Sequence, residues 1–167
     1  INLVGAEIEM LEDDRRESVL KNALMPLKEE YDYIIIDCQP SLGICTMNAL
    51  VASNSVIIPV QCEFFALEGI TQLLKTIMLA QKTLNPTLDI EGVLLTLLDS
   101  RTVLGLEVVE EVRKFFKEKV FNTIIPRLVR LSEAPSFGKS IIAYDQKSSA
   151  AQFYIDLAKE VVKNNVD

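Results

Sequence analysis

One carboxylate, that of Asp37, stands where a buried strand would present it to a ligand. Residues 31–36 are mostly apolar and end in three consecutive isoleucines, and Gln39-Pro40 then signals a turn. Such a run is typical of a strand covered on both faces of a parallel sheet. Ligands of open α/β sheets bind at the carboxyl ends of the strands. Asp37 could therefore hold Mg²⁺ beside phosphate groups, or it could simply form a turn or cap the next helix.

Two further polar side chains, Gln61 and Glu63, follow the next apolar run at residues 55–60. If that run is another parallel strand, its carboxyl end lies at the same edge of the sheet as Asp37. A glutamate here would also be favourable at the N-terminus of the helix that follows. Taken alone, the segment favours a capped strand-to-helix turn over a ligand site.

Three arginines follow later strand-like runs. Arg101 comes after residues 90–98, and Arg127 and Arg130 come after residues 120–125. Arginine pairs bidentately with phosphate, whereas most surface arginines are solvated or held in weak ion pairs. The spacing alone leaves both interpretations open.

Apolar runs alternate with helical patterns along the whole chain, and no linker divides it. This alternation predicts a single α/β domain over residues 1–167, with a mostly parallel sheet and helices on both faces. The expected strands are residues 1–5, 31–37, 55–60, 90–98 and 120–125. The expected helices are residues 13–30 with a break at Pro26, 41–52, 64–84, 102–119 and 148–164, and residues 131–143 are expected to be a loop.

Composition excludes several classes of protein. The net charge of −7 argues against a surface that grips nucleic acid all over, although a local basic patch remains compatible with it. The chain has no histidine and its three cysteines form no CxxC pair, so we expect no structural zinc site and a reduced, cytosolic setting. No apolar run approaches the roughly 20 residues of a membrane span.

The tripeptide Gly138-Lys139-Ser140 imitates the end of a phosphate-binding P-loop. That motif needs a glycine five residues before Gly138, and Glu133 stands there. A P-loop cradles phosphates with successive backbone N–H groups, and the other glycines open no such loop. We therefore interpret Gly138-Lys139-Ser140 as an ordinary loop.

Taken together, four segments closely resemble the ParA/Soj family of Walker-type ATPases, relatives of MinD. The segments occur in family order, span nearly the whole chain, and are far more specific together than any one alone. They are residues 31–42, 58–69, 92–102 and 125–139.

The resemblance implies a P-loop NTPase fold and a nucleotide site. It identifies Asp37 as the Walker B carboxylate, which contacts Mg²⁺ through water. It places Pro126 and Arg127 in the segment that lines the adenine of ATP. Two departures affect this region: Gln39 replaces a usual proline after Asp37, and Leu128 replaces a usual asparagine beside the adenine.

The resemblance also implies partners. Family members form a homodimer around ATP, bind DNA without sequence preference, and are stimulated by a ParB/Spo0J-type protein during chromosome or plasmid segregation. Arg101 and Arg130 match arginines implicated in DNA binding, and Gln61 and Glu63 lie in the switch segment near the dimer face. A cytoplasmic, nucleoid-associated protein without membrane attachment is expected.

The chain begins with Ile1 and shows no P-loop. We expect it to be the carboxyl-terminal part of a single ParA-type ATPase domain, an incomplete P-loop NTPase fold that alone is inactive and holds no nucleotide tightly. Two alternatives stay open: a nucleotide-free DNA-binding or dimerisation module, and a receiver-like signalling domain with Asp37 as phosphoacceptor. The second needs an acidic pair at the end of a first strand, whereas Asp13-Asp14 precedes a predicted helix.

Overall fold

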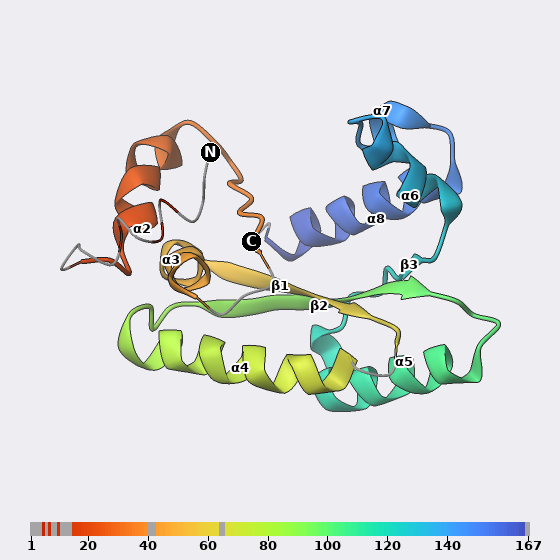
Figure 1. The fold of residues 1–167 in the computed structure, drawn as a ribbon, viewed down its shortest axis with the longest axis horizontal. Coiled ribbons are helices and arrows are strands. Elements are labelled where there is room, and N and C mark those ends of the chain that lie inside the picture. The colour runs from red at the N-terminus through yellow and green to blue at the C-terminus, as the bar shows by residue number, and fades with distance from the viewer. Residues whose placement is uncertain are drawn as a thin grey trace. The chain divides into compact units, whose positions relative to one another are not determined.

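The computed structural model describes residues 5, 7, 10, 15–39, 43–63 and 66–165, and it divides into two compact units. Unit 1 combines residues 1–56 with 71–89, and unit 2 combines residues 57–70 with 90–167. Three elements run through both units: the strands β1 (Ser55–Gln61) and β2 (Asp89–Leu98) and the helix α4 (Ala66–Thr83). Figure 1 shows these elements with the helices of each unit.

A parallel three-stranded sheet has the order β1-β2-β3, with β3 limited to Ile125–Pro126. Thr96 of β2 pairs with Ile125 of β3, and its side-chain hydroxyl donates to the carbonyl of Val60 in β1 at 3.2 Å. The Cys62 N–H donates to the Thr96 carbonyl at 2.9 Å, which continues the β1–β2 pairing past the end of β1. The carboxyl ends of all three strands therefore meet at one edge of unit 2.

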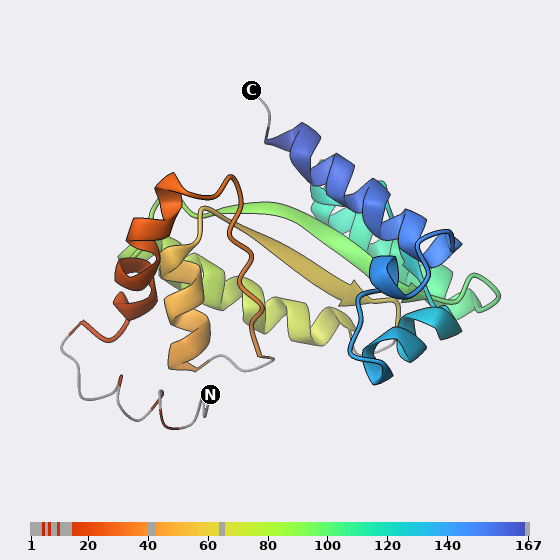
Figure 2. The same cartoon turned by 90° about the horizontal axis from the view of Figure 1, so that it is seen from above.

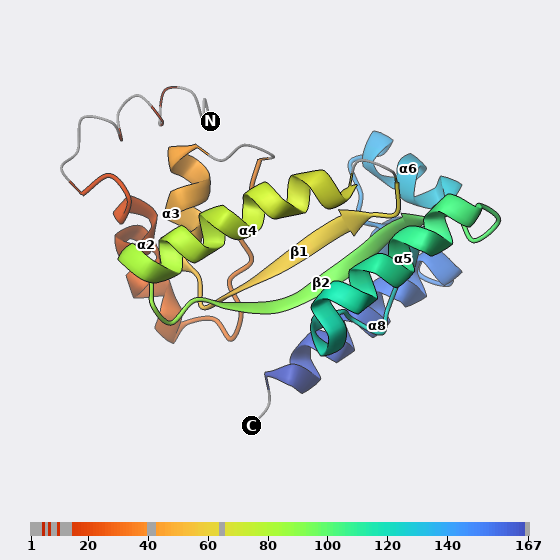
Figure 3. The ribbon, with the colours of Figure 1, turned by 90° about the horizontal axis from the view of Figure 1, so that it is seen from below.

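Helices cover both faces of the sheet in unit 2, as the alternation of the sequence predicts. The helix α5 (Val103–Phe116) lies on one face and α8 (Ser149–Asn164) on the other (Figures 1 and 3). Each begins at a hydroxyl N-cap, because Thr102 accepts the Gly105 N–H at 3.2 Å and Ser148 accepts the Ala151 N–H at 3.1 Å. The apolar side of α8 packs on a buried cluster of the sheet through Phe153, Leu157 and Val161.

The predicted strand at residues 120–125 is much shorter in the structure. Only Ile125 and Pro126 join the ladder, and Val120 forms an isolated bridge to Val93. Between them, the backbone N–H groups of Asn122 and Thr123 donate to the Glu160 carboxylate of α8 at 2.7 and 3.0 Å. The Glu160 side chain thus accepts N–H groups that a longer strand would have donated to a neighbouring strand.

The prediction of a loop at residues 131–143 is wrong. This stretch contains most of α6 (Val129–Ser136) and all of α7 (Ile141–Tyr144), which gather beside α8 in Figure 2. Pro135 lies in the last turn of α6, where its missing N–H leaves one hydrogen bond of the helix unmade. Gly138 then ends the helix with φ of +64°, and the N–H groups of Gly138 and Lys139 return to the carbonyls of Pro135 and Ala134 in a Schellman motif.

The prediction of a buried strand at residues 31–37 is also wrong for the described chain. These residues form no strand, and Ile35 is 83% exposed. An apolar run becomes a strand only when neighbouring strands take up its backbone N–H and C=O groups. The three-stranded sheet of the described residues provides no such pairing for this run.

Unit 1 holds the short helices α2 (Val19–Leu24), η1 (Met25–Glu29) and α3 (Ile44–Ala52). Pro26 stands in the first turn of η1, a 3₁₀ helix, so the predicted break is confirmed. Of the predicted strand at residues 1–5 only Gly5 is described, and it is helical, while a helix start at Asp13 or Asp14 lies outside the described residues. None of the described helices has the length and apolarity that a bilayer crossing requires.

Buried Asn85 is the polar link between the end of α3 and the turn before β2. Its amide donates to the carbonyls of Leu50 and Ser53 at 2.9 and 2.8 Å, and its amide oxygen accepts the Thr87 hydroxyl at 3.0 Å. Helix carbonyls near the C-terminus lack partners in the helix itself, so this amide supplies donors to two of them, one buried and one part-buried.

Replacing Asn85 with alanine is expected to lower the free energy of unfolding by about 2–3 kcal/mol, because two carbonyls lose their donor in a buried place. Urea unfolding of the chain measures the loss. Asn165→Ala is the matched control, since Asn165 is exposed and should change stability by less than about 0.5 kcal/mol. Equal stability of the two variants would contradict the linking role of Asn85.

Candidate functional site

Charged side chains from three strands meet at the carboxyl edge of the sheet in unit 2. Glu63 follows β1, Asp99 and Arg101 follow β2, and Arg127 follows β3. The Arg127 guanidinium forms an ion pair with the Glu63 carboxylate, and the Arg127 N–H donates to the Leu98 carbonyl at 2.9 Å. Glu63 and Arg127 are each about half exposed, so this pair contributes little to stability and remains accessible to a ligand.

Asp99 and Arg101 form a forked ion pair in the turn after β2. Arg101 Nε and Nη2 donate to Oδ1 and Oδ2 of Asp99 at 2.8 and 2.7 Å, and the Arg101 backbone N–H also donates to Oδ1 at 3.1 Å. The hydrogen bonds from the Arg101 side chain, followed by the one from its backbone N–H, lower the pKa of Asp99 to about 2, well below its usual range. The side-chain hydrogen bonds with Asp99 also raise the pKa of Arg101. The carboxylate therefore stays charged and bound to Arg101 at neutral pH.

We expect the Asp99 carboxyl group of the chain to titrate near pH 2, as followed by carboxyl chemical shifts in NMR spectra. Because its pKa is lowered on folding, the stability it adds is present above its unfolded value near 3.8 and is lost as pH falls toward 2. Arg101→Ala should return the midpoint toward 3.8. A midpoint that does not move would show that the pair is absent in solution.

A β-bulge directs this turn. Leu97 has φ of +53°, a left-handed conformation that is rare for a branched side chain, and the β2–β3 register shifts between Thr96 and Leu98. Bulges commonly re-aim side chains next to functional sites. A leucine gives no sequence signal for a left-handed residue, so the bulge could not be predicted from the pattern. The ion pair of Asp99 with Arg101 was not predicted either.

Arg130 lies in the first turn of α6 and has several looser neighbours. Its guanidinium is 3.3 Å from the Glu133 carboxylate and 3.7 Å from that of Asp145, and it lies 6.0 Å from the centre of the Tyr144 ring. Phe137 stacks on Tyr144 with ring centres 5.2 Å apart. More than half of the Arg130 side chain stays exposed, so it can reach a ligand on the surface.

The remaining predicted residues of unit 2 lie at the same strand ends. Gln61 is exposed at the end of β1, where its carbonyl accepts the Glu63 N–H at 2.8 Å. Pro126 is half-buried in β3, directly before Arg127. Leu128 is the residue preceding α6, and its extended backbone begins that helix without a side-chain cap.

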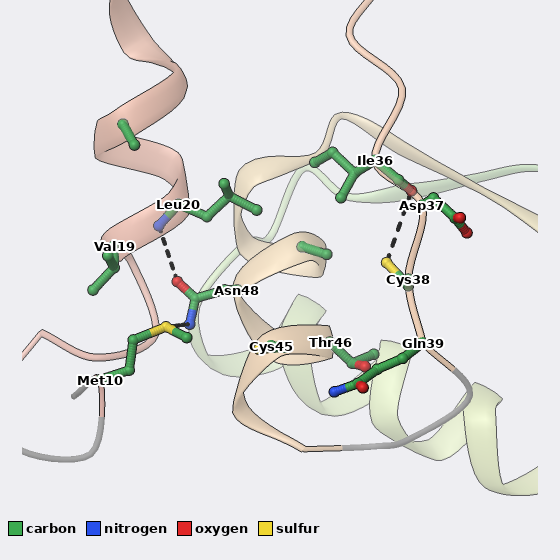
Figure 4. A pocket seen from close by; sticks show the side chains of 12 residues that line it. Met10, Val19, Leu20, Ile36, Asp37, Cys38, Gln39, Cys45, Thr46 and Asn48 are labelled. Atoms are coloured by element: carbon green, nitrogen blue, oxygen red, sulfur yellow. Dashed lines mark hydrogen bonds between the residues drawn. The ribbon is translucent and has the colours of Figure 1, made fainter. Parts of the chain in front are cut away.

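Asp37 belongs to unit 1, where it lines a pocket of about 320 Å³. In Figure 4 its carboxylate points away from α3, whereas Cys38 turns toward the helices and donates to the Ile36 carbonyl at 3.8 Å. The pocket walls are otherwise mostly apolar. Its lining residues are Met10, Val19, Leu20, Ala23, Ile36, Asp37, Cys38, Gln39, Cys45, Thr46, Asn48 and Ala49.

Comparison with known proteins decides the family. A family model described as an AAA domain matches residues 1–90. The sporulation initiation inhibitor protein Soj of Bacillus subtilis is 63% identical over 164 residues, which cover 98% of this chain and 65% of Soj. The chromosome partitioning protein ParA of Myxococcus xanthus is 56% identical over 98% of this chain and 58% of its own length. The chain belongs to the ParA/Soj family.

A solved structure supports the same fold. The cobyrinic acid a,c-diamide synthase of Mycobacterium smegmatis, with bound ADP and magnesium, matches with a TM-score of 0.79 and 38% identity over 95% of this chain and 58% of that one. The α/β architecture is thus that of a P-loop NTPase of the MinD/ParA kind, as predicted. The chain spans about 58–65% of the length of the ParA/Soj relatives named above.

The described residues fit only part of the nucleotide site of a ParA/Soj protein. No group of three or more acidic or thiol side chains among the described residues could enclose a metal ion, and the exposed Asp37 carboxylate is a ligand of the kind that Mg²⁺ prefers. Gly138 closes α6, and Ser140 caps α7 by accepting the Ala143 N–H at 3.2 Å. The loop interpretation of Gly138-Lys139-Ser140 is confirmed.

Proposed function

We propose that the protein, at its full encoded length, is a chromosome- or plasmid-partitioning ATPase. It would bind and hydrolyse ATP with Mg²⁺, dimerise, and bind DNA without sequence preference under the control of a ParB/Spo0J-type protein, in the cytoplasm at the nucleoid. The observation that carries the proposal is the 63% identity to Soj over 98% of the chain. That match spans the segments with the aspartate and the arginines named above.

The proposed roles are those that the resemblance to the ParA/Soj family implies. Asp37 acts as the Walker B carboxylate toward Mg²⁺, and Pro126 with Arg127 forms the wall beside the adenine. Gln61 and Glu63 form the switch side near the dimer partner. The contact of Glu63 with Arg127 supports this grouping, because it joins the switch segment to the base-side wall within one unit.

Arg101 and Arg130 form the proposed DNA face. Their side chains are 86% and 56% exposed, as phosphate contacts require. The chain as a whole carries a net charge of −7, so DNA affinity has to come from this local patch. A dimer would present the patch twice and thereby increase the number of phosphates contacted together.

Amide synthesis, the activity named for the Mycobacterium smegmatis structure, is the weaker candidate. That protein is 38% identical to this chain, compared with 63% for Soj and 56% for the Myxococcus xanthus ParA. A shared P-loop NTPase fold does not carry an activity with it. The partitioning role therefore has the stronger support.

The 167-residue chain alone is expected to release phosphate from ATP no faster than a buffer blank, because its described residues supply no phosphate cradle. A continuous phosphate assay with Mg²⁺ measures this. Turnover by the isolated chain that Asp37→Ala abolishes would overturn the prediction. DNA binding by the chain without any nucleotide would instead favour the nucleotide-free binding module.

A further inference from the structure

Asp99 holds Arg101 in a single orientation at the carboxyl edge of the sheet. Its two carboxylate oxygens accept both Nε and Nη2 of the guanidinium, at 2.8 and 2.7 Å. Such a planar fork fixes the side chain far more firmly than a single contact does. We infer that Asp99 is a positioning residue, which presents the free edge of the Arg101 guanidinium to a phosphate of the DNA backbone. The inference deepens the proposed function and rests on it.

The donors of Arg101 allow both contacts at once. A guanidinium has five N–H groups, and Asp99 occupies one on Nε and one on Nη2. Both N–H groups of Nη1 and the second one of Nη2 remain for an acceptor. Arg101 is 86% exposed while Asp99 is 24% exposed, so the carboxylate lies beneath the guanidinium and the donors face solvent.

The backbone of Asp99 is itself anchored to the start of α5. The Arg101 backbone N–H donates to Oδ1 of Asp99 at 3.1 Å. The Asp99 carbonyl accepts both the N–H and the hydroxyl of Thr102, at 3.1 and 2.9 Å, and Thr102 is the N-cap of α5. The bulge at Leu97 directs the same turn. Side chain, turn and helix start therefore form one connected support for the guanidinium.

A carboxylate near DNA also repels phosphates, so two effects oppose each other. The repulsion acts through solvent and is screened over about 8 Å at physiological salt. Without Asp99, the exposed Arg101 side chain would lose the freedom of several rotatable bonds when it binds DNA. The conformational entropy lost when an arginine side chain is ordered is among the largest of any residue. We expect the ordering of Arg101 to outweigh the repulsion, so that Asp99 strengthens DNA binding. Arg130 has no comparable fork, because its carboxylate neighbours lie at 3.3 and 3.7 Å through different nitrogens.

The test titrates a random-sequence DNA duplex with the protein at its full encoded length, loaded with ATP and Mg²⁺, at several salt concentrations. Asp99→Asn should weaken binding about three- to tenfold without changing the slope of affinity against salt, because the same phosphates are contacted. Arg101→Ala should weaken binding and make the slope shallower by about 1. Glu107→Gln is the matched control: it removes one exposed negative charge from α5 and should bind at least as tightly as the unchanged protein.

Thermal unfolding of Asp99→Asn, measured beside the titration, separates the two roles, because a positioning role weakens DNA binding at unchanged stability and a purely structural role does not. Arg101→Lys supplies a second measurement if Asp99→Asn fails to fold, since lysine keeps the charge but cannot form the fork. It should also weaken binding with the slope unchanged. If the Asp99→Asn or the Arg101→Lys protein binds DNA as tightly as the Glu107→Gln protein does, the inference is wrong. Absence of DNA binding by the unchanged protein would overturn the proposed DNA function, and the inference with it.

Discussion

Replacing Asp37 with alanine in the protein at its full encoded length is expected to reduce steady-state ATP turnover about a hundredfold or more, since the change removes a carboxylate proposed to support Mg²⁺. The fold should tolerate the change, because Asp37 is exposed and its side chain points away from α3 (Figure 4). Phosphate release in the presence of DNA and a ParB-type partner measures the loss, and thermal unfolding measures stability.

Asp32→Ala is the matched control for this experiment. Asp32 is an exposed aspartate five residues earlier in the same segment, so its loss removes the same charge without touching the proposed site. We expect it to keep turnover within about twofold of the unchanged protein, as surface substitutions usually do. Normal turnover in the Asp37→Ala protein would show that the Walker B assignment is wrong.

The sequence was sufficient to predict the elements whose apolar pattern and end signals lie within their own residues. The strand β2 and the helices α5 and α8 appear close to their expected positions. Their apolar patterns agree with the burial that the structure shows, and their N-caps Thr102 and Ser148 are themselves local signals. Local and tertiary preferences coincide here, which is why pattern reasoning succeeded.

It was insufficient where an element depends on a distant partner. Residues 31–37 have the composition of a buried strand, yet composition cannot supply the neighbouring strand that such a run requires. Residues 120–125 lose most of their expected strand because Glu160, far along the chain, accepts their backbone donors. No periodicity within either run contains this information.

The candidate site shows the same division. The sequence pattern put Glu63, Arg101 and Arg127 after strand-like runs, and the structure places all three at the carboxyl edge of unit 2. The same pattern put Asp37 at the end of a strand, whereas residues 31–37 form none. The sequence did not reveal that Asp99 supports Arg101, because an aspartate two residues before an arginine is common in turns. Only the folded structure shows that the two side chains form a fork.

Removing both proposed DNA arginines, Arg101→Ala with Arg130→Ala, is expected to weaken binding of the ATP-loaded protein to random-sequence duplex by one to two orders of magnitude. Each arginine would neutralise a phosphate and release counterions, so the slope of log affinity against log salt should become shallower by about 2. All duplex sequences should be affected alike, since phosphate contacts carry no sequence information.

Arg113→Ala is the matched control for each single variant, because Arg113 is an exposed arginine at the other end of α5 and its loss changes the net charge by the same amount as the loss of Arg101 or of Arg130. If the control weakens DNA binding as much as either single variant, the affinity follows total charge and not the patch at the carboxyl edge. If the double variant loses affinity for one sequence only, these arginines read base edges, because a loss of phosphate contacts lowers affinity for every duplex. A sequence-indifferent loss with a shallower salt slope is the result that places Arg101 and Arg130 on the DNA backbone.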